Sequence, residues 1–269
     1  MKRAYYIIIG LFILASCTKE IEVPLDEGDK KLIVESWFTN EQKVHEVKLT
    51  QSSSYFQNEA APKVSGALVQ ISGGGETFNF HEESPGIYHS DDEIGAQYMT
   101  SYTLRIEYEG EVYEATDHCD TVPSLDYMDL NPNYNDDGEL TGYDILVWTQ
   151  ELTGFGDYYA WRVLVNGEYV SDTLSDFTFA SDDFLGDGLY FEGWPIEWVE
   201  DVETGDVVRL EQHNLSKASF DMYNAIMLET EWRGGIFDTP PANVPSNFSN
   251  GALGNFVVSS MKASEVTVP

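Results

Sequence analysis

Short runs rich in β-branched and aromatic residues, separated by glycine and polar turns, recur from residue 29 onward. Several runs alternate apolar with polar side chains, which is typical of a strand with one buried face. Glycines interrupt them at Gly73–Gly75 and at Glu109–Gly110, where a hairpin turn is expected. Six such strands over about 90 residues predict an immunoglobulin-like or transthyretin-like β-sandwich at residues 29–117. The predicted strands are 31–38, 45–52, 67–72, 77–81, 101–110 and 111–116.

A further series of strands predicts a second β-rich domain at residues 127–269. The proline and polar residues of 118–126 separate the two series and predict a linker. Within the run 158–170, Asn166–Gly167 predicts a tight hairpin turn. The other predicted strands of this domain are 143–150, 206–214 and 255–260.

Residues 216–231 have a different period and predict the helix of the second domain. Apolar and half-polar positions recur at helical spacing, and Ser216 can serve as the N-cap. We expect the resulting stripe to pack on the sheet of its own domain. The recurring positions are Phe220, Tyr223, Met227 and Thr230.

The acidic composition limits the function classes that are open to the chain. A formal net charge of −33 at pH 7 excludes nucleic-acid binding through phosphate contacts, because these need lysine and arginine. High charge can also indicate disorder, but 42% hydrophobic and 13% aromatic residues are enough to build a core. A folded, strongly acidic body is therefore expected, and such a surface attracts cations.

The first 17 residues have the pattern of a secretion signal that ends in a lipidation site. A basic start precedes an apolar run that is too short to cross a bilayer, which needs about 20 residues. The tetrapeptide LASC, ending at Cys17, resembles a bacterial lipobox. It predicts a signal peptide at 1–16 and a lipidated tether at 17–28, with Cys17 as the acylated N-terminus. The alternative is an ordinary signal peptide with a cysteine at this place by chance.

Lys19 and Glu20 follow the cysteine and suggest an address. They are similar to the lysine–acid signal that sends some Bacteroidetes lipoproteins to the outside of the outer membrane. The expected location is therefore the outer membrane, lipid-anchored and facing the cell exterior. The alternative is a solvated tether without a signal. Anionic headgroups repel an acidic chain, so the acyl chains must supply the anchoring.

The loop at 131–144 partly matches a calcium-binding loop of twelve residues. Oxygen-bearing side chains alternate along it, and Gly138 stands where that template needs a sharp turn. The template differs in its last ligand, which should be a glutamate, and in the helices that should flank it. The alternative is a polar turn, where asparagine, aspartate and glycine are common. The predicted calcium ligands are Asn133, Asn135, Asp137, Glu139 and Asp144.

Aromatic residues concentrate at 177–198 and predict a ligand-binding surface that includes Trp194 and Trp198. Exposed tryptophan can stack on a sugar ring or anchor a protein interface. The alternative is that these rings fill the core between two β layers, since aromatic side chains bury large areas.

No catalytic signature is present, so the chain is not expected to be an enzyme and no cofactor other than calcium is predicted. The sequence has no nucleophile elbow, zinc-protease motif, phosphate-binding glycine loop or dinucleotide fingerprint. None of its five histidines lies at zinc-ligand spacing from another. A hydrolase that uses two carboxylates alone stays open as an alternative, acting on a polysaccharide or a peptide.

Several stretches, in order and spacing, resemble the Bacteroidetes lipoprotein family called domain of unknown function 4249. They include KKLIVESWFTN, ESPGIYHSDDEIGAQYMTSYTLRIEYEGEVYEAT, GDYYAWRVLV, GDVVRLEQHNLSKASFDMYNAI and PPANVPSNFSNGALGNF. One departure is HCDTVP, where members usually have a plainer proline-rich linker. The resemblance covers nearly the whole chain after the lipobox.

The resemblance implies a location and a partner rather than a reaction. Members are cell-envelope lipoproteins that are often encoded beside TonB-dependent outer-membrane receptors, and no enzymatic activity is established for them. The expected function is a surface-exposed binding or accessory protein of such a receptor in nutrient uptake. A structural or adhesive envelope protein is a further alternative.

Overall fold

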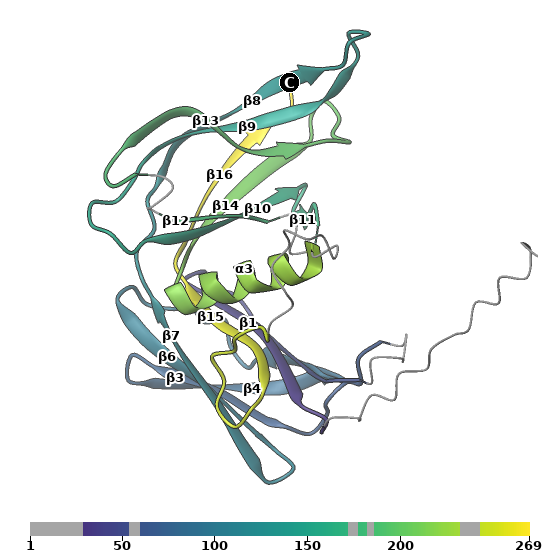
Figure 1. Cartoon of the computed structure of the whole chain (residues 1–269), viewed down its shortest axis with the longest axis vertical. Helices are drawn as coiled ribbons and strands as arrows, with labels where there is room; N and C mark the ends of the chain where they lie inside the picture. The colour runs from purple at the N-terminus through teal and green to yellow at the C-terminus, as the bar shows by residue number, and fades with distance from the viewer. Residues whose placement is uncertain (1–28, 54–59, 172–176, 182–185, 232–242) are drawn as a thin grey trace, which may run out of the picture.

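Strands make up most of the molecule, and one helix accompanies them in the part of the chain that is described. The computed structural model describes residues 29–53, 60–171, 177–181, 186–231 and 243–269. Figure 1 shows two β-rich halves with helix α3 (Lys217–Glu231) between them. The mainly-β class predicted from the alternating pattern is confirmed.

The first half is built on one sheet of eight strands in the order β15-β1-β2-β5-β4-β3-β6-β7. Neighbouring strands are antiparallel, except that β1 and β15 run parallel. All six strands predicted in this half are present, and β5 is additional. The strands are β1 (Leu32–Thr39), β2 (Glu46–Gln51), β3 (Leu68–Gly73), β4 (Glu76–Ser84), β5 (Ile87–Ser90), β6 (Thr100–Tyr108), β7 (Glu111–Cys119) and β15 (Leu253–Ser259).

The two edge strands of this sheet meet, so that the sheet nearly closes on itself. The N–H of Val258 in β15 donates a hydrogen bond of 2.9 Å to the carboxylate of Asp117 in β7, and Phe248 forms a bridge with Ala115. Burial raises the pKa of Asp117. A single curled sheet thus encloses the first core, where we expected two separate sheets of a sandwich.

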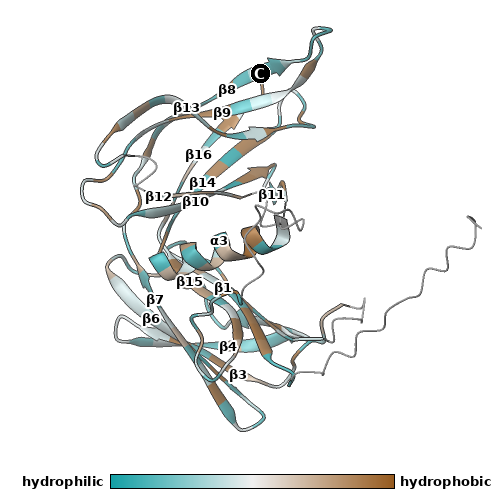
Figure 2. Cartoon of the chain, viewed as in Figure 1, coloured by the Kyte–Doolittle hydropathy of each residue, from teal (hydrophilic) through white to brown (hydrophobic). Residues whose placement is uncertain are grey.

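The first core consists of the side chains that alternate inward along these strands. Val34 and Phe38 of β1, Ile71 of β3, Leu104 of β6 and Phe256 of β15 are all completely buried. Each such side chain contributes about 1.5–3 kcal/mol to the free energy of unfolding. Figure 2 shows hydrophobic and hydrophilic positions mixed along each strand, as this alternation requires.

The second half packs two sheets face to face around the second core. One sheet has the order β11-β10-β14-β16, with β12 also paired to β10, and the other has the order β13-β9-β8. The predicted hairpin is confirmed between β10 and β11, because Asn166 and Gly167 both adopt positive φ. The strands are β8 (Leu125–Tyr134), β9 (Leu140–Gln150), β10 (Tyr158–Val165), β11 (Glu168–Tyr169), β12 (Thr178–Ser181), β13 (Tyr190–Val199), β14 (Val207–Leu215) and β16 (Met261–Thr267).

The C-terminal segment connects the two halves, which differs from the predicted division at 127–269. Strand β15 lies in the first sheet, and β16, which begins two residues later, lies in the second half. Where β15 passes into β16, the N–H of Ser260 donates to the side-chain oxygen of Asn214, and the N–H of Met261 donates to that of Asn40. Both donor–acceptor distances are 2.6 Å. Strand β7 also extends through part of the predicted linker at 118–126. Local patterns indicate strands but not the sheet that each strand joins.

Helix α3 begins after Ser216, which caps it as predicted. The Ser216 hydroxyl accepts a hydrogen bond of 3.2 Å from the N–H of Ser219. Ser219, Met222 and Tyr223 are buried, and Thr230 is exposed. Phe220 and Ile226 are half-buried against the same core. The helix therefore contacts both halves through β10, β14 and β15, where we expected contact with one. Among the described residues no helix has the length and apolarity needed to cross a bilayer.

Candidate functional site

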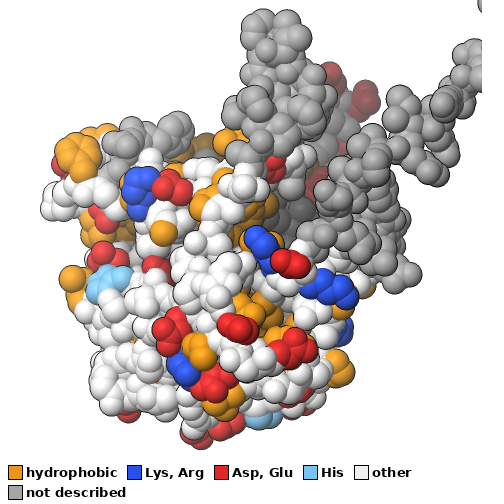
Figure 3. Space-filling model, turned by 60° about the horizontal axis from the view of Figure 1, so that its bottom comes forward, with side chains coloured by type: hydrophobic (Ala, Val, Ile, Leu, Met, Phe, Trp, Pro, Cys, Tyr) orange, Lys and Arg blue, Asp and Glu red, His pale blue; other side chains and the backbone are white. Residues whose placement is uncertain are grey.

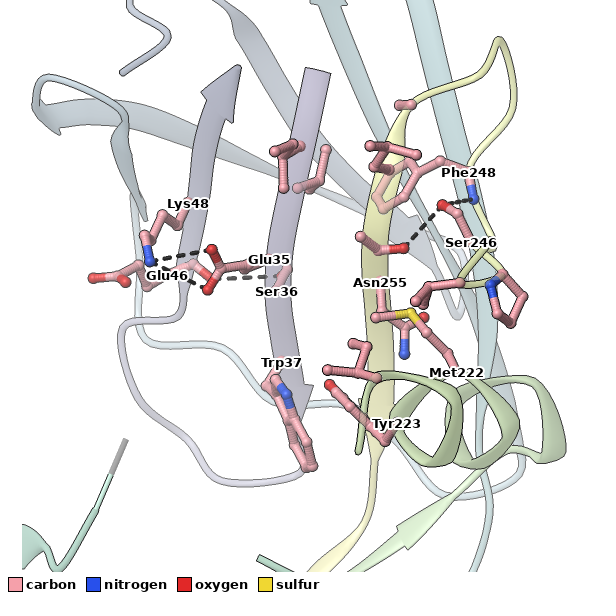
Figure 4. Close-up of a pocket in the computed structure, with 18 of the residues that line it drawn as sticks. Glu35, Ser36, Trp37, Glu46, Lys48, Met222, Tyr223, Ser246, Phe248 and Asn255 are labelled. Atoms are coloured by element: carbon pink, nitrogen blue, oxygen red, sulfur yellow. Dashed lines mark hydrogen bonds and ion pairs between the residues drawn. The ribbon is translucent and has the colours of Figure 1, made fainter. Parts of the chain in front are cut away.

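A groove of ≈ 1300 Å³ lies between the outer face of the first sheet and helix α3. We call it the α3 groove. Its floor is formed by β1, β2 and β15, its wall by α3 and residues 243–252, and one end by β10, β11 and Phe177 of the second half. Figure 4 shows the floor and the helical wall. Pockets for drug-sized ligands measure about 300–1000 Å³, so this groove has room for a larger molecule.

Strand alternation determines which side chains reach the groove. In β1, Val34 and Phe38 point into the first core, so Trp37 points to the opposite face. In β15, Phe256 points into the same core and Asn255 points out. One strand face thus stabilises the fold while the other lines the groove.

Arg162 of β10 lies at the end of the groove that the second half forms, among three aromatic rings. Its guanidinium carbon is 3.6 Å from the ring centre of Tyr169, 4.7 Å from that of Phe177 and 5.8 Å from that of Trp37. Such contacts stabilise a cation over the faces of the rings. They use the faces of the guanidinium and not its N–H donors, which lie in its plane.

The Nε of Arg162 is buried without a hydrogen-bond partner, and no ion pair of the described residues includes this side chain. Glu211 lies opposite Arg162 in the β10–β14 register. Its carboxylate instead contacts Arg209 at 3.1 Å, the Tyr169 hydroxyl at 3.0 Å and His213 at 3.4 Å. Among the described residues, Arg162 is therefore a cation without a carboxylate partner at the end of the groove.

Asn255 is a second polar group without a partner. Its side chain is 4% exposed, and neither its amide nitrogen nor its amide oxygen makes a hydrogen bond of normal geometry in the described structure. The hydroxyl of Tyr223 is its polar neighbour, and burial raises the pKa of this hydroxyl. Buried amides are nearly always hydrogen-bonded, so a pair of unsatisfied amide atoms beside a groove indicates a place for a polar ligand group.

The stacked rings of Trp37 and Tyr223 lie between these two polar groups. Their ring centres are 5.9 Å apart with an interplanar angle of 27°, and His213 meets the edge of Trp37 at 5.1 Å. Figure 4 shows Trp37 and Tyr223 close together beside α3. The arrangement is a rigid apolar wall with one unpaired polar group on each side of it.

The lysines of the groove differ from Arg162 because two of them are paired. Lys48 contacts Glu35 at 3.1 Å across β1 and β2, and Lys43 contacts Glu41 at 2.7 Å. Figure 3 shows acidic and basic side chains close together on the face of the first half. Exposed pairs of this kind contribute about 0–1 kcal/mol and do not define a binding site.

A buried Ser-His-Glu arrangement lies near the groove. Nδ1 of His213 is 3.3 Å from Oγ of Ser259, and Nε2 is 3.4 Å from the Glu211 carboxylate. Burial lowers the pKa of His213, so the neutral ring donates from Nε2 to the carboxylate. A catalytic serine is activated by the same series of groups, a histidine placed between the serine hydroxyl and a carboxylate. Ser259 is completely buried, however, and the lining of the groove includes none of the three residues. The arrangement is therefore a structural contact between the halves.

The structure separates the two tryptophans that were predicted to bind a ligand. Trp194 packs into the second core, with ring centres 6.0 Å from Trp161 and 5.0 Å from Phe191. Trp198 is 48% exposed, and its indole lies against Gly142. The register of β13 shifts between them, so they do not form one surface. The predicted lipid site Cys17 and the export residues Lys19 and Glu20 lie outside the described residues.

The predicted calcium ligands lie in the hairpin between β8 and β9. The Asn135 side-chain oxygen accepts the N–H groups of Asp137 and Glu139, at 3.1 and 2.8 Å, as a turn-capping residue does. The amide of Asn133 donates to Asp144 over 2.7 Å. No group of three or more His, Cys, Asp or Glu with metal-binding geometry occurs among the described residues. Calcium binding at this hairpin stays a prediction.

Sequence reasoning missed the groove, although one signal pointed to it. Arg162 is the only charged residue in β10, whose sequence is YYAWRVLV. A charge within an apolar strand is rarely buried unless it has a partner, so its position indicates a specific contact or a ligand. Asn255 carries no such signal, because a polar residue near a strand end is common.

A comparison with protein families shows to which family the chain belongs. Residues 18–265 match the family described as Domain of unknown function (DUF4249). The chain belongs to this family. The match spans both halves and the residues that line the groove.

Comparisons with other proteins add little. No curated protein matches the chain. Among solved structures, a chain from "Cytokine receptor complex - Crystal form 1A" is 10% identical, with 88% of this chain and 95% of that chain covered. The TM-score is 0.26, which does not establish a common fold.

Proposed function

We propose that the chain is a lipid-anchored binding protein of the cell envelope that assists a TonB-dependent outer-membrane receptor in nutrient uptake. The observation that carries the binding role is the α3 groove, which contains the guanidinium of Arg162 and the amide of Asn255. Among the described residues, Arg162 has no ion pair and the Asn255 amide has no hydrogen bond of normal geometry. Concave sites with an apolar lining and a few convergent polar groups are where proteins bind small molecules.

The envelope location is supported by the LASC tetrapeptide that ends at Cys17 and by the Lys19–Glu20 pair after it. An acylated cysteine with two or more chains would hold the protein stably at a bilayer. The partner is supported by the resemblance to lipoproteins of Bacteroidetes that are encoded beside TonB-dependent receptors.

Affinity purification from the solubilised envelope tests the partner and the anchor together. We expect an outer-membrane receptor to co-purify with the tagged full chain, and deletion of the gene to reduce uptake of a nutrient. The variant Cys17→Ser should lose the membrane fraction and the receptor together. A preparation without a receptor, together with unchanged uptake in the deletion strain, would contradict the proposal.

Two substitutions on the same helix test the groove. Ile226 lines it, so Ile226→Trp should narrow it and prevent rescue of uptake in the deletion strain. Leu228 is 60% exposed on α3 and does not line the groove, so Leu228→Trp should restore uptake fully. Melting temperatures of both variants show whether each is folded. Full rescue by a folded Ile226→Trp variant would exclude the groove from the function.

A further inference from the structure

We propose that the α3 groove binds short peptides that have a free C-terminal carboxylate. Arg162 takes the terminal carboxylate, and Asn255 takes a peptide group of the ligand's backbone. The inference rests on the proposed function, because it names the ligand class of the same groove.

The carboxylate is inferred from the surroundings of Arg162. A guanidinium presents donors in a planar fork that matches the two oxygens of a carboxylate. The rings of Tyr169 and Phe177 hold this group in place without using those donors. An Arg held rigidly by aromatic rings loses little side-chain freedom when it binds, so it is preorganised for an anionic group.

The peptide group is inferred from the amide of Asn255. Both of its polar atoms are buried and make no hydrogen bond of normal geometry among the described residues. Turned toward the groove, the amide offers one donor and one acceptor together. A backbone peptide unit has the complementary acceptor and donor, whereas a carboxylate or a simple alcohol matches only part of this pair. A peptide satisfies both atoms at once.

The volume of the groove and its two polar groups favour a ligand of several residues. The two polar groups lie on either side of the Trp37–Tyr223 stack, and the groove has a volume of ≈ 1300 Å³. Met222, Ile226 and Leu253 provide apolar contacts along it. A peptide of several residues can reach both polar groups and place apolar side chains on this wall.

The net charge of −33 strengthens the assignment of Arg162 as the group that binds the carboxylate. An acidic body repels anions at long range, and salt screens this repulsion within about 8 Å at physiological ionic strength. A carboxylate ligand can therefore bind only where a local cation outweighs the field. Peptide binding should become tighter as the salt concentration rises from low to physiological values.

The test uses the lipid-anchored full chain in nanodiscs of neutral phosphatidylcholine. A pool of apolar hexapeptides with free C-termini is compared with the same pool in amidated form, and retained peptides are identified by mass spectrometry. The best sequence is then measured in both forms by isothermal titration. Loss of a charge-assisted contact corresponds to about a tenfold or greater change in Kd, so the free acid should bind at least tenfold tighter.

Substitutions separate the two contacts. Arg162→Gln should weaken binding of the free-acid peptide until its Kd equals that of the amidated peptide. Asn255→Leu should weaken binding of both forms equally. Arg162→Lys keeps the charge without the fork and should retain part of the preference, which covers the case that Arg162→Gln does not fold. Arg105→Gln is the matched control, because Arg105 pairs with Glu107 and Glu114 away from the groove and its loss should change neither Kd.

Three other outcomes overturn the inference, and a fourth overturns only the receptor role. Equal binding of acid and amide removes the role of Arg162. If no peptide is retained and dodecanoate, titrated as a carboxylate without peptide groups, binds instead, the ligand is not a peptide. If a receptor co-purifies but no peptide is retained, the inference fails while the proposed function stands. If peptides bind but no receptor co-purifies and uptake is unchanged, the receptor role fails and the peptide site stands.

Discussion

Arg209 contacts three carboxylates where the two halves meet. Its guanidinium is 3.2 Å from Glu41 of the first half, 3.1 Å from Glu211 beside it and 3.0 Å from Glu265 of β16. Only Glu211 is buried, with a side chain 5% exposed. Burial alone would raise the pKa of Glu211, but hydrogen bonds from His213 and Tyr169 and the charge of Arg209 hold it below its usual range.

Glu211→Gln is expected to lower the free energy of unfolding by about 1.5–3 kcal/mol, because it removes the buried charged partner of a guanidinium that keeps its two exposed carboxylate contacts. Glu265→Gln, at the exposed end of the same Arg209, should change it by about 1 kcal/mol or less. Urea unfolding followed by fluorescence measures both. Equal effects of the two substitutions would contradict the importance of the buried contact.

His213 predicts how stability depends on pH. Burial lowers its pKa below the ordinary value of 6.5, so the unfolded chain binds a proton near pH 6.5 and the folded chain does not. The contribution of His213 to the free energy of unfolding is therefore complete above pH 6.5. It falls as the pH drops, by up to about 1.4 kcal/mol per pH unit. The lowered pKa of Glu211 adds a further loss below its ordinary value of 4.5.

Urea unfolding at pH 7.5, 6.5 and 5.5 measures this dependence. His213→Asn should reduce its slope, whereas Thr230→Asn, which exchanges no titratable group at an exposed position, should leave the slope unchanged. A slope that is identical in all three proteins would contradict the prediction.

At the scale of elements, the parallel pairing of β1 with β15 depends on a close approach of the two backbones. Gly254 has a φ of +96°, and a Cβ at this position would lie 1.9 Å from the carbonyl oxygen of Val34. The strand register places Gly254 directly opposite Val34. Only glycine permits both the backbone conformation and the contact.

Gly254→Ala is expected to lower the free energy of unfolding by about 1–3 kcal/mol more than Gly251→Ala does. Gly251 also has a positive φ, of +72°, but a Cβ there meets nothing within 4 Å. The difference between the two variants therefore isolates the clash with β1 from the backbone strain. Thermal and urea unfolding measure it, and two equal values would show that β15 can move away from β1 without loss.

At the scale of the whole molecule, the passage from β15 to β16 makes the halves depend on each other. One continuous segment supplies an edge strand to each half, and α3 packs against strands of both. The halves also share the contacts of Asn40 and Asn214 with this segment. Unfolding of one half would therefore remove contacts that hold the edge strand of the other.

We therefore expect a single unfolding transition. Far-ultraviolet circular dichroism, which reports on all strands, should coincide with tryptophan fluorescence, most of which comes from the second half. The predicted boundary at 118–126 would instead give two domains with separate transitions. Two resolved steps in either signal would show that the shared segment does not couple the halves.

Sequence reasoning predicted the secondary-structure elements better than the candidate site. The six strands of the first half, the hairpin at Asn166–Gly167 and the helix after Ser216 were predicted because their signals are local. Of the predicted stripe of α3, Tyr223 is buried and Phe220 packs against the same core, whereas Thr230 is exposed. For the site, Trp198 is exposed as a binding residue should be, but the groove itself was missed.

The sequence by itself determined the mainly-β class, the position of most strands and the acidic charge, because alternation and turn residues act over a few neighbouring positions. Tertiary structure alone decided that β15 pairs with β1, that one sheet nearly closes, and that Arg162 lies among the rings of Trp37, Tyr169 and Phe177. The reason is physical: a local pattern specifies which face of a strand is buried, but its partner is chosen by the packing of the whole chain. An unpaired side chain is a property of that packing.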